Sequence, residues 1–388
     1  MTVRTWQFNA ADSLFFGAGK PMNAGESSWI DSQFPPTGLT LQGAIRTAVL
    51  YCTEADIDAF THGKPCFPDG GSLKAEIGCA KNLGKLELTG PFLHDNGELL
   101  FPAPLDLMSN AQNQRALLKP AGDPTACDLG NIRLPAVDGK GYKVSENCYV
   151  NHQDMAKLLN GETDGIKLIP LFADNPKDLA LADKEPKIGL ARDNKTRNYE
   201  EGMLFAIAPV RPRKDVSLLL RVQGIAPEHL PQQASLQKLG GEGKLAAISV
   251  SDEDIKMPAA RITPDGETVR FKLVFTQPAL MPVDSDGWLP EGFALSKEKD
   301  QWIGQLRIGQ LNACEVAIIS ACIGKPLKLG GWDLKAGSSK THQAYIPAGS
   351  VYFCEAQAKD REAILQLHDT KLGGNREYGF GHVLVGRW

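Results

Sequence analysis

The two halves of this chain close in the same way, and this repeat constrains the fold more than any other feature of the sequence. Each half ends with an apolar segment, a segment of helical spacing, the letters K-L-G-G, a glycine-bearing loop and a last apolar segment. The K-L-G-G letters stand at 238–241 and at 371–374. Such internal similarity indicates a duplicated unit. The order of elements is that of the β-α-β-β-α-β unit, the split βαβ or ferredoxin-like motif.

The fold class expected from this repeat is α+β, with two ferredoxin-like (RRM-like, split βαβ) domains. The first domain would contain residues 1–256 and the second residues 257–388, with the junction near Asp252–Pro258. Residues 53–200 are rich in Gly, Pro, Asn and Asp, which predicts a long irregular insertion in the first domain. Strands are predicted over 3–8, 203–210, 217–225, 244–250, 350–356 and 382–388, and helices over 35–52, 227–239 and 359–372.

The helix over 35–52 is the most strongly supported element. Leu41, Ile45, Ala48, Val49 and Cys52 recur at helical spacing. Two prolines precede the segment and stop any earlier helix, and a threonine at 37 or 40 can cap it.

Composition excludes several other classes of protein. The chain has 388 residues with 42% hydrophobic residues and a net charge of −4, which is ordinary for a globular protein. It begins without the pattern of a signal peptide, and no apolar run approaches the roughly 18 residues of a membrane span. Its eight cysteines contain no C-x-x-C pair and are expected to be reduced thiols, so we expect a cytoplasmic protein with no membrane partner.

Motifs of catalysis are sparse, and we predict no catalytic residue, no cofactor and no metal. The patterns G-x-x-x-x-G-K-[ST], H-E-x-x-H and G-x-S-x-G are all absent. His62, Cys66 and Cys79 have some of the spacing of a zinc site, but no second close pair completes it. His382 and His342 are the candidates for an acid or base if the protein cleaves RNA without metal, and a packed or solvated histidine is the alternative for each.

Three segments could contact nucleic acid. The first is the loop GGNREYGFG at 373–381, where glycines would let backbone N–H groups approach a phosphodiester. An arginine adds charge there, and two aromatic residues offer planes on which bases could stack. An ordinary helix C-cap and turn is the alternative reading. The candidate residues of this loop are Lys371, Gly373, Gly374, Asn375, Arg376, Tyr378, Gly379, Phe380 and Gly381.

The second segment is the start of the first predicted helix, because free N–H groups at a helix N-terminus attract anions. Its candidate residues are Gly38, Gln42, Gly43 and Arg46, and an amphipathic helix with a solvated arginine is the alternative.

The third segment is a basic stretch from 186 to 214, which holds seven basic and three acidic residues in a chain that is acidic overall. Asp193-Asn194 is a good turn, so a projecting hairpin over about 188–202 is expected. Arg192, Lys195 and Arg197 near its tip could grip a phosphate backbone, and a solubilising loop is the alternative.

Five blocks of the sequence, taken in order, resemble one protein family. They are LFFGAGKPMNAGE (14–26), FPPTGLTLQGAIRTAVL (34–50), GLARDNKTRNYEEGMLF (189–205), LGGEGKL (239–245) and REYGFGHVLVGRW (376–388). They resemble the third subunit of the CRISPR type III-B (Cmr) effector complex, in the branch of the RAMP superfamily that caps the 5′ end of the guide RNA.

That resemblance implies more than the residues do by themselves. It implies two ferredoxin-like domains that hold the repeat-derived 5′ tag of the guide RNA. It implies that the protein sits between the large polymerase-like subunit and a backbone RAMP subunit. It also implies a thumb hairpin, here 188–202, close to the target RNA. The expected function is a non-catalytic RNA-binding subunit of an antiviral ribonucleoprotein. The alternatives left open are a metal-independent endoribonuclease that processes guide RNA precursors and an assembly subunit without RNA contact.

Overall fold

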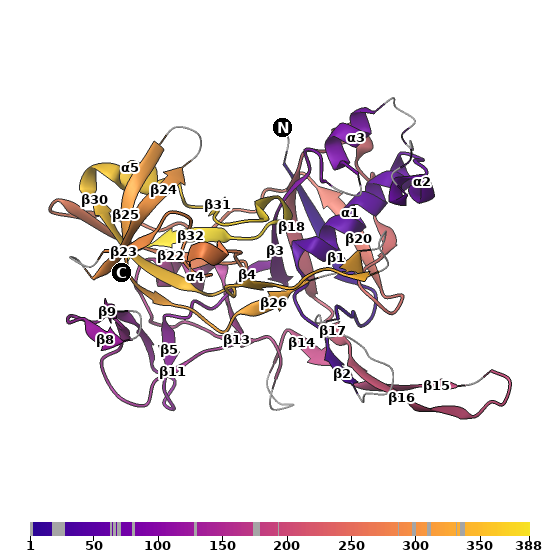
Figure 1. Cartoon of the computed structure of the whole chain (residues 1–388), viewed down its shortest axis with the longest axis horizontal. Coiled ribbons are helices and arrows are strands. Elements are labelled where there is room, and N and C mark those ends of the chain that lie inside the picture. Colours follow the sequence, from indigo (N-terminus) through magenta and orange to yellow (C-terminus); the bar gives the residue numbers. More distant parts are fainter. Residues whose placement is uncertain are drawn as a thin grey trace. The chain divides into compact units, whose positions relative to one another are not determined.

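The fold is mixed α/β and rich in sheet (Figure 1). The computed structural model describes residues 3–17, 28–62, 64, 67, 71–79, 82–127, 130–173, 179–192, 194–285, 287–296, 300–308, 312–330, 332–333 and 338–388. Five α-helices occur within this described part of the chain. None of the helices described there combines the length and the apolarity that a membrane span requires.

The chain divides into two compact units, and each unit is assembled from three segments. Unit 1 contains residues 1–97, 171–255 and 328–343, and unit 2 contains residues 98–170, 256–327 and 344–388. The chain passes from one unit to the other at Ile255–Lys256, inside the predicted junction. Residues 98–170, predicted as part of an insertion in the first domain, group with unit 2. The domain ranges 1–256 and 257–388 stay a prediction.

The main sheet of unit 1 is antiparallel, with strand order β3-β18-β1-β20-β19. Its central strand β1 pairs with β18 on one side and with β20 on the other, so that Trp6 stands opposite both Leu220 and Val250. Helix α1 (Gly38–Cys52) contacts β3 and β19. Leu41 and Ile45 of α1 are fully buried, which confirms the helix predicted from their spacing.

The elements of unit 1 are as follows. They are β1 (Arg4–Ala10), β2 (Ser28–Asp31), α1, α2 (Ile57–Thr61), α3 (Ser72–Ile77), β3 (Glu87–Asp95), β14 (Ala182–Lys184), β15 (Lys187–Arg192), β16 (Tyr199–Ala208), β17 (Val210–Pro212), β18 (Val216–Gln223), η1 (Pro227–His229), β19 (Ser235–Lys238), β20 (Leu245–Ser251), β27 (Trp332–Asp333) and β28 (Ser338–Ser339).

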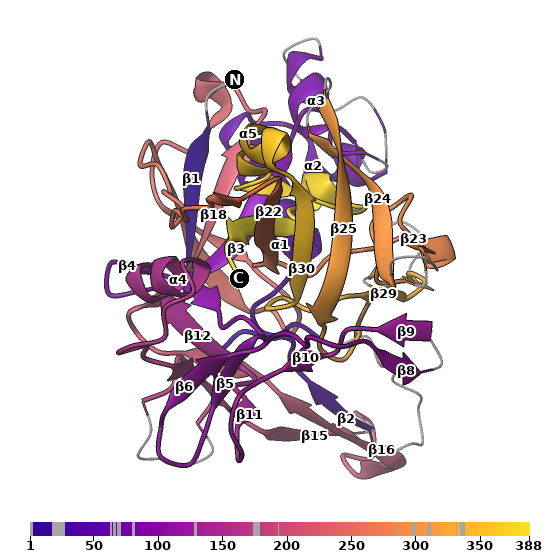
Figure 2. The ribbon, with the colours of Figure 1, turned by 90° about the vertical axis from the view of Figure 1, so that its left-hand side faces the viewer.

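Unit 2 contains a second sheet with strand order β23-β24-β25-β30-β22-β32-β31, to which β21 adds by pairing with β22 (Figure 2). Its interior strand β22 pairs with β30 and β32, and every second residue from Val269 to Phe275 is apolar. Val269, Phe271, Leu273 and Phe275 enter the hydrophobic core together with Ile364 and Leu367 of the α5 region. Arg270 and Lys272 lie on the opposite face of the strand, because successive side chains of a strand point to opposite sides.

The elements of unit 2 are as follows. They are β4 (Glu98–Pro102), β5 (Leu107–Ser109), β6 (Arg115–Leu117), β7 (Lys119–Pro120), β8 (Thr125–Cys127), β9 (Gly130–Ile132), β10 (Pro135–Ala136), β11 (Lys143–Val144), β12 (Cys148–Asn151), α4 (His152–Leu159), β13 (Ile169–Pro170), β21 (Pro264–Asp265), β22 (Thr268–Phe275), η2 (Val283–Ser285), β23 (Ala294–Ser296), β24 (Gln301–Ile308), β25 (Asn312–Cys322), β30 (Val351–Gln357), η3 (Ala358–Asp360), α5 (Arg361–Leu365), β31 (Thr370–Lys371), η4 (Arg376–Tyr378) and β32 (His382–Gly386). The short strands β26 (Leu327–Leu329) and β29 (Gln343–Tyr345) pair with each other.

Two predicted helices are corrected. The segment 227–239 forms only a 3₁₀ turn at its start, and Ser235–Lys238 is instead the edge strand β19, paired with β20. Pro231 explains the failure, because proline lacks an N–H donor and disfavours helical geometry in the residue before it. In the segment 359–372, the α-helix covers only Arg361–Leu365. It cannot continue beyond the next turn, because Asp369 has a φ of 64°.

The segment 53–200 is more regular than predicted. It supplies β3, a strand of nine residues in the main sheet of unit 1, and it supplies α4, which contacts β4, β12 and β32 in unit 2. Residues 18–27, which carry most of the first resemblance block, lie outside the described residues.

Candidate nucleic-acid interface

The glycine loop at 373–381 lies in unit 2 between β31 and β32, which pair with each other. Two of its glycines occupy positions that no other residue fits. A Cβ on Gly381, which has a φ of +74°, would stand 1.8 Å from the Leu372 carbonyl oxygen, and one on Gly373 would stand 2.4 Å from the Leu280 oxygen. The glycines therefore let the loop pack closely against its neighbours within the unit.

Several backbone N–H groups of this loop are already bonded. Gly374 N–H donates to the Leu280 oxygen at 2.8 Å, and Gly381 N–H donates to the Pro278 oxygen at 2.8 Å. Tyr378 and Gly379 donate to carbonyl oxygens within the loop itself. The expectation that glycine amides here turn toward a phosphate is therefore corrected for three glycines, Gly374, Gly379 and Gly381. Their hydrogen bonds fix the shape of the loop instead.

Side chains of the loop divide into an exposed and a buried set. Arg376 is exposed on the 3₁₀ turn η4, next to the exposed Glu377, while Lys371 and Tyr378 are half-buried. Phe380 is only 2% exposed and packs on Tyr345 with ring centroids 4.7 Å apart. The expected role of Phe380 as an open stacking plane is corrected, because its ring belongs to the interior.

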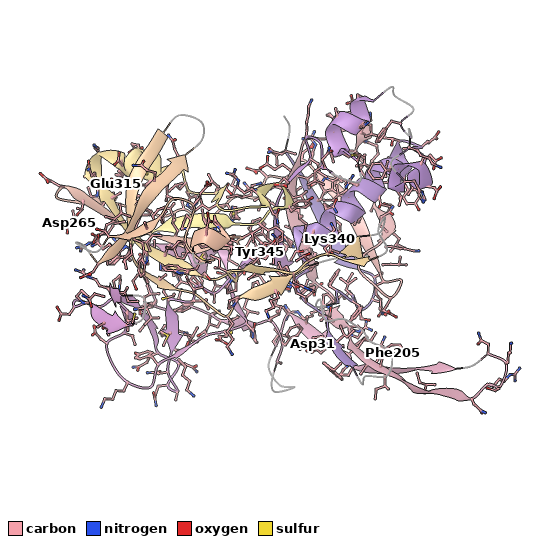
Figure 3. The ribbon with its side chains drawn as sticks, in the orientation of Figure 1. Asp31, Phe205, Asp265, Glu315, Lys340 and Tyr345 are labelled. Atoms are coloured by element: carbon pink, nitrogen blue, oxygen red, sulfur yellow. The ribbon has the colours of Figure 1, made fainter. Side chains whose placement is uncertain are left out.

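Tyr345 is a residue of the site that sequence reasoning missed. The ring of Tyr345 (labelled in Figure 3) packs on Phe380, and its hydroxyl accepts a hydrogen bond from Asn375 Nδ2 at 2.7 Å. Asn375 itself has a φ of 57°, so this bond supports a left-handed residue just before the exposed arginine. Tyr345 carries no motif, and only its spatial position reveals the role.

The second predicted segment, at α1, has one open side. Gly38 is buried, and Thr37 is the N-cap residue, although its side chain makes no capping hydrogen bond. Gly43 faces open space, since no atom lies within 4 Å of where its Cβ would be. Gln42 is half-buried and accepts a hydrogen bond from Arg46 Nη1 at 3.2 Å.

Arg46 is engaged inside unit 1. Its Nη2 donates to the Cys79 carbonyl oxygen, and its guanidinium lies over the ring of Phe60, 4.7 Å from the centroid. These contacts connect α1 to the segments of α2 and α3. Arg46 is thus held in place by its own unit, which differs from the freely solvated arginine of the alternative reading.

The third predicted segment is a hairpin, as expected. Strands β15 and β16 pair antiparallel from Lys187↔Ile207 to Arg192↔Tyr199, with an irregularity between Leu190 and Arg192. In Figure 1 the hairpin extends well beyond the rest of unit 1. Lys195 and Arg197 are exposed at its turn, and Asp193 lies outside the described residues.

The base of the hairpin is anchored by an aromatic residue. Phe205 of β16 (labelled in Figure 3) packs against Phe15, Ile30 and Ile207. It stands opposite Gly189, where any Cβ would come within 2.3 Å of the Phe205 ring. Further out, Ile188 and Leu190 are 75% and 58% exposed, so the hairpin carries apolar side chains that its own unit does not cover.

The two histidine candidates, His382 and His342, differ in their exposure to solvent. His382 is fully buried, with Nδ1 2.5 Å from Thr276 Oγ1 and Nε2 2.7 Å from Asp369 Oδ1. This Thr-His-Asp chain has the connectivity of a nucleophilic triad, but Thr276 is only 1% exposed, so the three side chains form part of the interior of unit 2. His342 is exposed.

The partial zinc pattern does not assemble within the described residues. His62 Nδ1 contacts its own helix at Asp58, and Cys66 lies outside the described residues. Across the part of the chain that the structure describes, no three His, Cys, Asp or Glu side chains are grouped to hold a metal ion. The seven cysteines described are free thiols.

Comparison with known proteins identifies the family of this chain. The sequence model of a family of CRISPR-associated proteins matches residues 6–388, which is nearly the whole chain. The chain belongs to this family, CRISPR-associated protein (Cas_Cmr3), and is a Cmr3-type subunit of a type III-B CRISPR effector. Comparison with curated protein sequences gives no match.

Solved structures offer distant similarities. A chain in the cryo-EM structure of the Type III-B Cmr-beta bound to cognate target RNA shares 18% identity at a TM-score of 0.48, over 90% of this chain and 86% of that chain. A chain in the form with target RNA and AMPPnP shares 16% identity at 0.46, with the same coverage. A chain of the Csm1-Csm4 cassette with AMPPNP shares 10% identity at 0.32, over 89% and 97%.

Proposed function

We propose that this chain holds the repeat-derived 5′ tag of the guide RNA and bridges the large subunit of the effector to its backbone subunits. In this role it is an RNA-binding scaffold and not a nuclease. The single observation that carries the proposal is Arg376, an exposed cation on a glycine loop whose backbone is fixed by hydrogen bonds. A loop with a fixed backbone suits a phosphate contact, because little loop freedom is lost when the strand binds.

The strand orders support two ferredoxin-like domains. In unit 1, β1, β3, β18 and β20 succeed one another along the chain and lie side by side in the order β3-β18-β1-β20. In unit 2, β22, β25, β30 and β32 lie in the corresponding order β25-β30-β22-β32. Both orders suit a β-α-β-β-α-β unit whose helices are partly reduced. The 3₁₀ turn η1 would replace the second helix of unit 1, and η2 with its flanking segments would replace the first helix of unit 2.

The proposed RNA contacts are the residues anticipated in the sequence, with two revised roles. Arg376, Lys371 and Tyr378 would meet RNA through side chains, while Phe380 and the glycines would keep the loop in shape. On α1, Gly43 would offer close backbone approach and Arg46 would contribute charge. The other anticipated residues would shape these two segments and not contact RNA directly; they are Gly38, Gln42, Gly373, Gly374, Asn375, Gly379 and Gly381.

The hairpin of β15 and β16 is proposed as the thumb that lies near the target RNA. Its exposed Lys195 and Arg197 would contact phosphates, and Arg192 would precede them on the strand. The uncovered Ile188 and Leu190 suit contact with bases or with a neighbouring subunit.

One comparison of variants tests the role that we propose for Arg376. Binding of a tagged guide RNA is measured for the full chain, for Arg376→Ala and for Glu377→Ala, alone and with the large subunit present. Loss of one charged hydrogen bond should weaken binding about tenfold in Arg376→Ala. Glu377→Ala, which changes an adjacent exposed residue of opposite charge, should bind at least as tightly as the native chain. Equal affinity of all three proteins would contradict the proposed role of the loop.

A further inference from the structure

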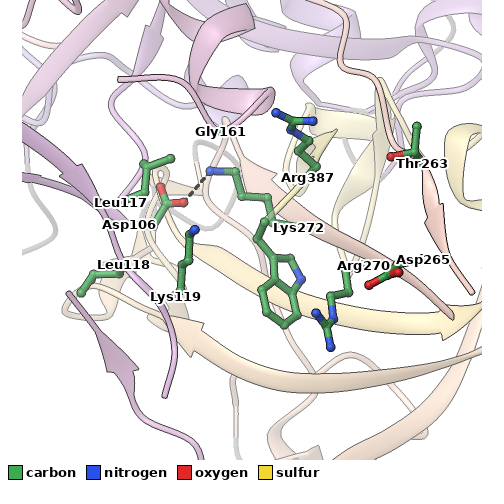
Figure 4. A pocket seen from close by; sticks show the side chains of 11 residues that line it. Asp106, Leu117, Leu118, Lys119, Gly161, Thr263, Asp265, Arg270, Lys272 and Arg387 are labelled. Atoms are coloured by element: carbon green, nitrogen blue, oxygen red, sulfur yellow. Dashed lines mark hydrogen bonds and ion pairs between the residues drawn. The ribbon is translucent and has the colours of Figure 1, made fainter. Parts of the chain in front are cut away.

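A polar pocket lies within unit 2, on the face of the sheet opposite the hydrophobic core (Figure 4). Its volume is about 330 Å³, at the lower end of the range of small-ligand sites. Four cationic side chains and two carboxylates line it. Its principal lining residues are Asp106, Lys119, Asp265, Arg270, Lys272, Arg387 and Trp388. None of these residues belongs to the glycine loop or the hairpin.

The wall of the pocket contains a buried ion pair with an unused acceptor. Lys272 Nζ lies 2.5 Å from Asp106 Oδ2, and both side chains are only 1% exposed. The second carboxylate oxygen, Asp106 Oδ1, is buried and has no hydrogen-bond partner among the described residues. An unsatisfied acceptor in such a place costs about 1–3 kcal/mol, and a ligand in the adjoining cavity that carries a hydrogen-bond donor would remove this cost.

One cation of the pocket lies over an aromatic ring, and a second is oriented by a backbone carbonyl. The Arg270 guanidinium lies over the Trp388 ring at 5.4 Å and also pairs with Glu355. Arg387 donates through Nε to the Asn160 carbonyl oxygen, which orients its guanidinium. Lys119 is exposed, and no ion-pair partner occurs for it among the described residues. The lining therefore offers positive charge, a stacking plane and a hydrogen-bond acceptor in one small space.

We infer that this pocket binds a single ribonucleotide. Its phosphate would pair with Lys119 and Arg387, its base would stack on the plane formed by Arg270 and Trp388, and its ribose 2′-hydroxyl would donate to Asp106 Oδ1. Each match follows ordinary chemistry: phosphates bind arginine and lysine, bases stack on aromatic and guanidinium planes, and carboxylates accept from ribose hydroxyls. The inference goes beyond the proposed tag-holding role, because no residue that lines this pocket belongs to the glycine loop, to α1 or to the hairpin.

An acidic peptide suits the pocket less well. Its carboxylates would match the cations and a backbone N–H could donate to Asp106 Oδ1, but acidic side chains carry no planar ring that could stack on Arg270 and Trp388. A ribonucleotide provides an anion and a hydroxyl donor in the same small molecule. It could come from two sources, as a free nucleotide or as one residue of an RNA strand, and the pocket chemistry is the same for both.

The test uses the full chain and the four ribonucleoside 5′-monophosphates, with binding followed by calorimetry and by ligand-observed NMR. Lys119→Ala should weaken binding about tenfold, and the 2′-deoxy monophosphates should bind the native chain about tenfold more weakly than their ribose counterparts. Lys325→Ala is the matched control, since Lys325 is an exposed lysine of unit 2 outside the pocket. Lys119 is also exposed, so its replacement should leave the fold intact.

Several outcomes would overturn the inference. They are the absence of nucleotide binding, equal binding by Lys119→Ala, equal binding of ribo- and deoxyribonucleotides, and inorganic phosphate or a glutamate peptide binding as tightly as the nucleotide. Absence of nucleotide binding in a chain that still binds tagged guide RNA would refute the pocket alone and leave the proposed function standing.

Two further outcomes would support the pocket as a nucleotide site and show whether its nucleotide is free or part of an RNA strand. Displacement of the mononucleotide by a short oligoribonucleotide would assign the pocket to an RNA strand. Simultaneous binding of both would assign it to a free nucleotide.

Discussion

At the scale of single residues, two glycines of this chain differ in whether the fold requires a glycine at their position. Gly381 has a positive φ, and its position leaves no room for a Cβ, whereas Gly43 lies within α1 and faces open space. The first glycine is required by the backbone. The second has no structural requirement in its own unit, and glycine inside a helix costs about 0.5–1 kcal/mol relative to alanine. A glycine retained at a cost to stability suits close approach by a ligand.

Replacing these two glycines should therefore move stability in opposite directions. Gly43→Ala should raise the free energy of unfolding by about 0.5–1 kcal/mol, and it should weaken RNA binding because the new methyl group blocks backbone approach. Gly381→Ala should destabilise the chain by at least about 1–3 kcal/mol. Denaturant unfolding and RNA titration of both variants measure these effects. A Gly43→Ala chain that is more stable and binds RNA normally would remove Gly43 from the proposed interface.

His368 provides a prediction about pH. Burial lowers the pKa of His368, and its Nδ1 accepts a hydrogen bond from Val385 N–H at 3.1 Å. The unfolded chain therefore binds a proton at this residue more readily than the folded chain does. Stability from His368 is present above the ordinary pKa of 6.5 and is lost as the pH falls through the lower folded pKa.

The matching experiment compares urea unfolding at pH 7.5 and at pH 5.5. His368→Gln keeps an acceptor that does not titrate, so it should lose less stability on acidification than the native chain. His342→Gln, at an exposed position, is the control and should behave like the native chain. An identical pH response of His368→Gln and the native chain would contradict the account.

At the scale of elements, the charged side chains of the β15–β16 hairpin are not the ones that hold it in the fold. Phe205 anchors its base, while Lys195 and Arg197 are exposed at its turn. Removing the two charges should leave stability within about 0.5 kcal/mol. It should reduce the log–log salt slope of single-stranded RNA binding by about 1.4, because each neutralised phosphate contributes about 0.7.

The measurement is a salt series on the double variant Lys195→Ala/Arg197→Ala. The double variant Lys214→Ala/Lys238→Ala removes two exposed lysines of the same unit outside the hairpin turn and should keep the native slope. Equal slopes in both double variants would mean that the hairpin does not contact phosphates.

Sequence patterns predicted the elements whose signal is local. The spacing in α1 and the apolar runs of β1, β18, β20, β30 and β32 were sufficient to place these elements. The edge strand β19 was not predictable, because Leu236 and its neighbours form a strand only through pairing with β20. In the candidate site, Arg376 and the hairpin could be predicted from charge and glycine content. The burial of Phe380 against Tyr345 could not, because that contact joins residues 35 positions apart.

At the scale of the whole molecule, unit 2 is built from segments distant in sequence. Lys272 of β22 depends on Asp106 for its only described salt bridge, and Arg387 N–H donates to the Leu159 oxygen of α4. The segment 98–170 therefore completes the unit that contains the C-terminal strands. Without it, Lys272 would lose its buried partner.

A fragment of residues 257–388 should consequently fail to fold by itself. Removal of one partner from a buried ion pair costs about 3–5 kcal/mol, which is a large share of the stability of a typical domain. Circular dichroism and NMR dispersion of this fragment, compared with the same fragment co-expressed with residues 98–170, measure the dependence. A cooperatively folded isolated fragment would contradict the described organisation of unit 2.

The central claim is that this chain holds the 5′ tag of the guide RNA without cutting it. The most direct measurement is the affinity of the chain, together with the large subunit, for guide RNA carrying the native tag and for guide RNA carrying a scrambled tag. The RNA is recovered on a denaturing gel. The account predicts tighter binding of the native tag, with the RNA intact. Equal affinity for both RNAs, or metal-independent cleavage of either, would contradict it.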